Sequence, residues 1–138
     1  MGVFRMRVDH IAIAVRNLED AVKVYSSLFG KEPDHYEEVE EQKVKTAIFY
    51  LGDVRIELLE PTSDDSPIAK FLAKRGEGLH HVSYKVDNIE SKLLELKDAG
   101  FRLINEEPRV GAEGKLIAFI HPKSLVGVLT ELTQDTKE

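Results

Sequence analysis

Residues 10–19 read His10-Ile-Ala-Ile-Ala-Val15-Arg-Asn17-Leu-Glu19, and the pattern returns 71 residues later as His81-Val-Ser-Tyr-Lys-Val86-Asp-Asn88-Ile-Glu90. In both stretches a His opens a run that alternates between two faces, which is typical of a half-buried strand. An Asn follows each run where it can cap a helix. A repeat spaced by about half of the chain predicts two equivalent modules.

Each copy continues through an amphipathic helix into three further strand patterns. We expect these strands at about 34–40, 44–51 and 54–60, and again at 102–105, 115–121 and 126–133. A short linker helix begins at Ser66-Pro67 and ends at Gly76. The prediction is an α+β fold with two tandem βαβββ modules, whose curved sheet surrounds a cleft. The expected boundaries are one domain at 7–138, module 1 at about 7–61, the linker helix at 66–76 and module 2 at about 79–134.

Composition excludes several classes of protein. The 138 residues contain 25 acidic and 19 basic side chains, for a net charge of −6, without the Lys/Arg cluster that nucleic-acid binding needs. The chain has no cysteine, which excludes disulfides, thiolate metal sites and thiol catalysis. It also lacks an apolar run long enough to span a bilayer. We therefore expect a cytoplasmic protein with neither nucleic acid nor membrane as a partner.

Strand alternation predicts which side chains face the cleft. In the first copy the apolar face of Ile11, Ile13 and Val15 belongs against the helix, so His10 faces the cleft beside two alanines that leave space. The same reasoning places His81 in the cleft. A lone strand histidine is more often structural, but two at equivalent positions of a repeat favour a site.

Each module also carries an acid inside an apolar strand, Glu57 in Ile56-Glu57-Leu58 and Glu131 in Thr130-Glu131-Leu132. Such an acid can face solvent on a half-exposed sheet. Alternatively, a buried carboxylate needs a partner or a metal to offset several kcal/mol of desolvation. Two imidazoles with two carboxylates suit Co²⁺, Ni²⁺, Zn²⁺ or Mn²⁺. Four ligands on an octahedral ion leave two positions for a bidentate substrate.

Four further motifs stand out in the sequence: Ser66-Pro67-Ile68-Ala69-Lys70-Phe71-Leu72, Gly78-Leu79-His80-His81-Val82, His121-Pro122-Lys123-Ser124 and Gly127-Val128-Leu129-Thr130-Glu131-Leu132. With the duplicated pattern they resemble the methylmalonyl-CoA epimerase family of the vicinal oxygen chelate superfamily, which shares the glyoxalase fold. The resemblance covers residues 7–134, and its most specific part is the His-Pro-Lys-Ser ending together with the linker.

The resemblance implies a metal-dependent epimerisation of (2R)- and (2S)-methylmalonyl-CoA in propionate metabolism. Removal and return of the C2 proton through a metal-stabilised enolate would invert the centre. It implies the ligands His10, Glu57, His81 and Glu131, with Glu57 standing where some members have Gln. It further implies cobalt as the divalent metal, an acyl-CoA substrate, Glu131 as one catalytic group and a homodimer.

Other roles follow less directly. Some relatives are proposed to use a second Glu as base at the position of Thr46, so water or Lys45 would have to supply that function here. The phosphates of coenzyme A need cationic or N–H partners. The candidates are Lys123, His121, Arg109 and Lys115 around residues 111–114.

Two alternative functions stay open at this point. The ligand set with Glu57 equals that of bacterial-type glyoxalase I, which isomerises a glutathione hemithioacetal. The same fold also occurs in proteins that bind a small molecule without catalysis. The linker and His-Pro-Lys-Ser motifs argue against the first alternative, and the complete ligand set argues against the second.

Overall fold

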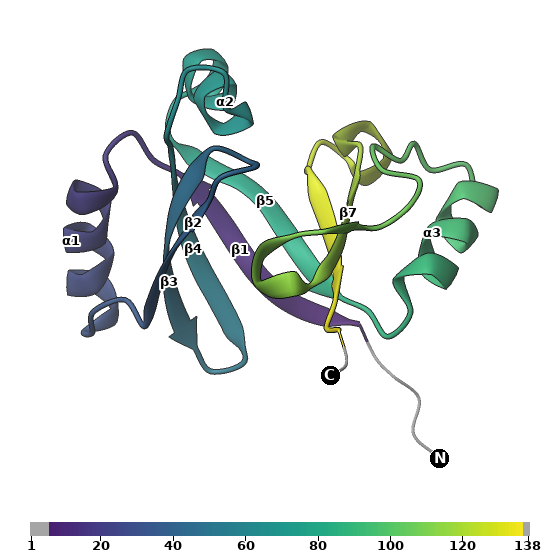
Figure 1. Cartoon of the computed structure of the whole chain (residues 1–138), viewed down its shortest axis with the longest axis horizontal. Helices are drawn as coiled ribbons and strands as arrows, with labels where there is room; N and C mark the ends of the chain where they lie inside the picture. Colours follow the sequence, from purple (N-terminus) through teal and green to yellow (C-terminus); the bar gives the residue numbers. More distant parts are fainter. Residues whose placement is uncertain (1–5, 137–138) are drawn as a thin grey trace. The chain divides into compact units, whose positions relative to one another are not determined.

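A computed structural model describes residues 6–136, which form two compact units (Figure 1). One unit is His10–His80, and among the described residues the other joins 6–9 to 81–136. Each unit contains the expected βαβββ order of elements, so the α+β class and the two modules are confirmed. The boundary of a single domain at 7–138 stays a prediction. Within residues 6–136, every helix is too short or too polar to cross a membrane.

The unit His10–His80 consists of a mixed four-stranded sheet and two helices. Its strands follow the order β2-β3-β4-β1, and β1 runs parallel to β4 with His10 opposite Arg55. Figure 1 shows α1 beside β3 and β4. The elements are β1 (Arg7–Ala14), α1 (Leu18–Phe29), β2 (His35–Val39), β3 (Val44–Leu51), β4 (Val54–Pro61) and α2 (Pro67–Arg75).

The second unit repeats this design with one helix. Its strands follow the order β5-β8-β7-β6, and β5 runs parallel to β8 with Ser83 opposite Glu131. The elements are β5 (Gly78–Lys85), α3 (Ile89–Asp98), β6 (Arg109–Val110), η1 (Ala112–Gly114), β7 (Leu116–Ile120), η2 (Pro122–Leu125) and β8 (Thr130–Gln134).

The first helix of each unit begins in the same way. The Asn17 side chain accepts from the third helical N–H of α1, and Asn88 does the same for α3, as predicted. The first helical N–H also has a matching partner. Leu18 donates to Glu60 Oε1 at 2.6 Å, and Ile89 donates to Gln134 Oε1 at 2.8 Å. In each module, a side chain at the equivalent position of the last strand therefore accepts a hydrogen bond from the first N–H of the helix.

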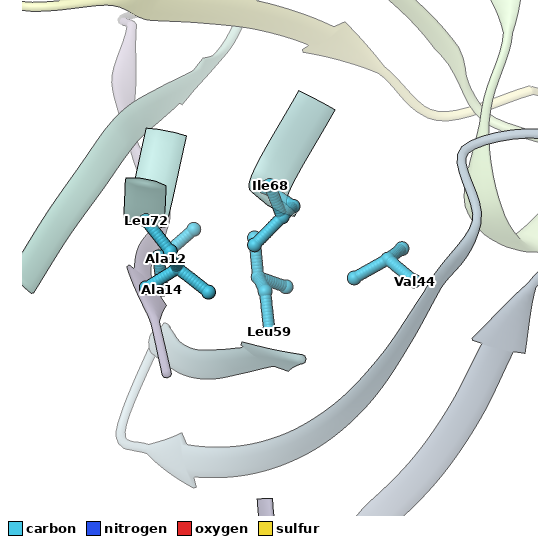
Figure 2. Close-up of a cluster of buried hydrophobic side chains, with 6 residues drawn as sticks. All are labelled: Ala12, Ala14, Val44, Leu59, Ile68 and Leu72. Carbon is cyan, nitrogen blue, oxygen red and sulfur yellow. The ribbon is translucent and has the colours of Figure 1, made fainter. Parts of the chain in front are cut away.

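The sheet of His10–His80 packs against a helix on each face. On one face, Val15 and the partly buried Ile13 pack against α1 as the alternation predicted, together with Phe49 and Leu58. On the other, which we call the α2 face, the side chains of Ile68 and Leu72 project from α2 onto the sheet (Figure 2). The sheet residues below them are Ala12, Ala14, Val44 and Leu59. We expected Ala12 and Ala14 to leave open space beside His10, but α2 fills that space.

Two strands of the second module differ from the prediction. Residues 102–105 form no strand: they make the isolated bridge of Leu103 to Ile120 and backbone hydrogen bonds to Phe119 and His121, and the Asn105 side chain accepts from the Phe119 N–H at 2.8 Å where a strand would offer a backbone carbonyl. The short strand forms instead at 109–110. The last strand starts at Thr130 rather than 126, since Pro122–Leu125 turns into a 3₁₀ helix that interrupts the extended chain.

Candidate metal centre

One His–Glu pair lies on the α2 face of the unit His10–His80. His10 is two residues before Ala12 on β1, and Glu57 is two residues before Leu59 on β4. Residues two apart on a strand share a face, so His10 and Glu57 both point to the α2 face. His10 Nδ1 lies 3.6 Å from Glu57 Oε2, and the two side chains are 9% and 14% exposed. The predicted partners of module 1 are thus together and largely buried.

The second His–Glu pair lies on the face of β5 and β8 that points away from α3. Leu132 packs toward α3, so its neighbour Glu131 points the opposite way. His81 Nε2 lies 3.7 Å from Glu131 Oε1, and both residues are buried. The Phe119 ring meets the imidazole edge to face at 5.4 Å and limits how the His81 ring can turn.

The chemistry and spacing of each pair fit a divalent cation. Both nitrogen–oxygen distances exceed a hydrogen bond. Ligand atoms at about 2.0–2.2 Å from one ion, roughly 90–120° apart, are separated by roughly 3–3.7 Å. Neutral imidazole and ionised carboxylate are ligands that borderline divalent metals accept. Each pair could therefore supply two neighbouring ligands.

Two polar residues beside the pairs were missed by the sequence analysis. Arg55 Nη2 is 3.4 Å from His10 Nδ1 and 3.8 Å from Glu57 Oε2. A visible signal existed, because Arg55 and Glu57 are two residues apart in an otherwise apolar strand. Ser83 is fully buried opposite Glu131, and its Oγ has no hydrogen-bond partner within residues 6–136. A serine in an alternating strand carries no such signal.

Three of the four candidate contacts with coenzyme A, Arg109, His121 and Lys123, lie in two places of the second unit. Arg109 is exposed on β6 and pairs with Ile117, which puts it on the face of His81 and Glu131. His121 and Lys123 are together after β7, where His121 Nδ1 accepts from the Lys123 N–H at 3.0 Å. Their contact with a substrate stays a prediction.

The environment of His121 favours its neutral form. Desolvation lowers the pKa of His121 below its ordinary value of 6.5, and the nearby cations Arg102 and Lys123 lower it further. Because Nδ1 accepts a hydrogen bond, the proton of the neutral ring is on Nε2. His121 can therefore donate through Nε2 without adding charge.

Residues 45 and 46 point to opposite faces of β3. Thr46 is buried and pairs with Leu59, so it shares the α2 face with Glu57. Lys45 points toward α1, where its Nζ lies 3.8 Å from Glu60 Oε2. The sheet thus separates Lys45 from Glu57, which argues against Lys45 as an acid or base at the candidate site.

Comparisons with known proteins agree with the motif resemblance. The family described as Glyoxalase/Bleomycin resistance protein/Dioxygenase superfamily matches residues 9–119. The ethylmalonyl-CoA/methylmalonyl-CoA epimerase of Cereibacter sphaeroides is 40% identical, over 93% of this chain and 97% of that protein. The human mitochondrial methylmalonyl-CoA epimerase is 41% identical, over 93% and 73%.

A solved structure extends this likeness to the fold. It is a variant of Streptomyces coelicolor methylmalonyl-CoA epimerase in complex with 2-nitronate-propionyl-CoA. The TM-score is 0.88 at 40% identity, with 94% of both chains covered. The family resemblance of the motifs and the fold class predicted from the repeat are both confirmed.

Proposed function

Because the chain belongs to the methylmalonyl-CoA epimerase family of the glyoxalase/bleomycin resistance protein/dioxygenase superfamily, we propose that it interconverts the 2R and 2S epimers of methylmalonyl-CoA with a bound divalent cation. The family makes it an enzyme of the epimerase class, as the motifs predicted. The observation that carries the metal part of the proposal is the repetition of one buried His–Glu pair in each module.

His10, Glu57, His81 and Glu131 hold the cation in this proposal. Their support is the equivalent position of the two pairs in the repeat, their nitrogen–oxygen distances and their donor chemistry. Cobalt is the proposed ion, and Zn²⁺, Ni²⁺ and Mn²⁺ share its ligand preferences. When bound, the cation supplies a Lewis acid that stabilises negative charge on the thioester oxygen.

Glu131 is the proposed base. Inversion at C2 requires that a proton leave from one side of the carbon and that another arrive on the opposite side. Glu131 takes the proton, while the electron pair of the broken C–H bond moves to the thioester oxygen and forms an enolate. The carboxylate has two oxygens, so one can serve the cation and the other the proton. Its burial among apolar strands keeps bulk water from the reacting carbon.

A water molecule is the proposed acid on the opposite side of C2: it gives a proton to that carbon, and the hydroxide left behind recovers the proton held by Glu131 through solvent, so that both groups return to their starting state. Thr46 shares the α2 face with Glu57, but its hydroxyl cannot serve as the carboxylate base that some relatives are proposed to use at this position. Lys45 lies on the other face of β3 beside Glu60. Because neither side chain supplies the second proton transfer, we assign that transfer to water.

The remaining proposed contacts bind the coenzyme A part of the substrate. Arg109 and Lys123 are exposed cations that can pair with its phosphates. His121 adds a neutral N–H donor from Nε2. We also propose a homodimer in the cytoplasm, on the basis of the family resemblance and the composition. Light scattering during gel filtration tests the dimer, which should have twice the mass of one chain.

Proton NMR in D₂O tests the chemistry directly. Cobalt-loaded protein should exchange the C2 proton of methylmalonyl-CoA and collapse the splitting of its methyl signal. His81→Ala should abolish exchange, whereas His35→Ala, which alters an exposed His on β2, should keep it. A coupled assay with an epimer-specific mutase then confirms inversion. Exchange no faster than with cobalt alone would overturn the proposal, and turnover of a glutathione hemithioacetal would favour the glyoxalase alternative.

Glu131→Gln separates the two roles assigned to Glu131. Gln keeps an oxygen ligand but cannot accept the proton. We therefore expect the variant to retain bound cobalt, measured by elemental analysis after gel filtration, and to lose exchange at C2. Normal exchange with bound metal would remove Glu131 from the proton transfer and leave the rest of the proposal intact.

A further inference from the structure

We propose that Arg55 is a positioning residue of the metal centre. Its positive charge offsets the negative charge of Glu57, which weakens the binding of the cation and makes the bound cation more electrophilic. This inference rests on the proposed function, because it concerns the same four ligands. It assigns a role to a residue that neither the repeat nor the ligand set requires. The contacts of Arg55 that support this role all lie within the single unit His10–His80.

The geometry places one guanidinium nitrogen against both members of the first pair. Nη2 of Arg55 is 3.8 Å from Glu57 Oε2 and 3.4 Å from His10 Nδ1. All three side chains share one face, because Arg55 is two residues before Glu57 on β4 and lies opposite His10 on β1. The Arg55 side chain is only 16% exposed, so solvent screens its charge weakly.

The internal repeat shows that the fold does not require this cation. Glu57 and Glu131 occupy equivalent positions, so the counterpart of Arg55, two residues before the acid, is Leu129. The second His–Glu pair keeps a nitrogen–oxygen distance of 3.7 Å with an apolar residue there. A structural need for arginine beside the pair would apply to both modules. The asymmetry points to a role in the charge of the site.

Counting charges indicates what that role is. A divalent cation with two carboxylate ligands is formally neutral, and Arg55 returns the site to a charge of about +1. A free carboxylate on the substrate then enters a positive site instead of a neutral one. Arg55 also competes with the cation for Glu57 and repels it across a largely buried space. Its removal should therefore tighten metal binding while making the bound ion less electrophilic.

Calorimetric titration of metal-free protein with CoCl₂ measures this directly. Arg55→Gln should bind cobalt at least about tenfold more tightly than wild type. Arg55→Lys keeps the charge and should stay within about threefold. Glu57→Gln should bind more weakly, and the double variant with Arg55→Gln should recover most of the loss. Arg55→Met repeats the first test if the Gln variant fails to fold, as judged by circular dichroism.

Lys45→Gln is the matched control. It removes one positive charge at the same 3.8 Å from a glutamate, but on the opposite face of the sheet. Its cobalt affinity should stay within about threefold of wild type, because distance and water screen its charge. Unchanged or weaker binding by Arg55→Gln, or a double variant no better than Glu57→Gln, overturns the role of Arg55 alone. Wild-type protein that binds no cobalt overturns the metal centre itself.

Discussion

Val126 adopts a backbone conformation that valine rarely adopts. Its φ is 58° and its ψ is 35°, in the left-handed region, at the end of the 3₁₀ helix Pro122–Leu125. Its N–H donates to the Pro122 carbonyl, and the Gly127 N–H donates to the same carbonyl at 2.8 Å. Glycine is the usual residue where a helix ends in this way. The Val126 side chain is 99% exposed, so it contributes no burial to offset the strain.

These observations predict that Val126→Gly stabilises the protein. The left-handed conformation costs an ordinary residue about 1–2 kcal/mol, and the cost falls away with glycine. Glycine in turn loses about 0.5–1 kcal/mol more conformational entropy on folding. Since almost no apolar area is removed, the expected gain in the free energy of unfolding is about 0.5–1 kcal/mol. For a chain of this size the gain raises the Tm by roughly 2–4 °C.

Urea unfolding followed by circular dichroism measures the difference. Val126→Ala is the control, because alanine keeps the Cβ that clashes in the left-handed region but removes the branched methyl groups. The glycine variant should be more stable than both the alanine variant and wild type, with an unchanged dependence on urea concentration. A glycine variant no more stable than the alanine variant would refute the reasoning from strain.

Three further predictions concern packing, capping and charge. Leu72→Ala should lower the free energy of unfolding by about 2–5 kcal/mol, because it opens a cavity between α2 and the sheet; urea unfolding measures this, and a loss below 1 kcal/mol would contradict it. Asn88→Ala should cost about 1 kcal/mol by leaving the Ser91 N–H uncapped, whereas Asn88→Asp should cost much less. The Lys85 ammonium, 2.8 Å away, holds the pKa of Asp135 below its ordinary value of 3.8. The ionised carboxyl therefore adds stability above that pH and loses it as the pH falls through the folded pKa. Asp135→Asn should be less stable than wild type at neutral pH, and unfolding curves should converge in acid; a constant gap would exclude this linkage.

Local signals in the sequence determined much of the fold. Strand alternation around His10 and His81 depends on neighbouring residues only, and so do the two Asn caps. These signals can therefore be read from the sequence without knowledge of distant contacts. The repeat then carried the reasoning from one module to the other. The pairing of His10 with Glu57 and of His81 with Glu131 followed from it, and each pair is together in its unit.

Tertiary structure alone decided where the chain departs from these patterns. The α2 helix covers Ala12 and Ala14 because its own apolar stripe needs a partner, and local alternation cannot show which element will supply one. Similarly, Asn105 replaces a strand contact by a side-chain hydrogen bond. The approach of Arg55 to His10 depends on the parallel register of β1 and β4, which joins residues 45 positions apart. Patterns with short periods determine faces and ends, whereas contacts between distant strands depend on how the whole unit packs.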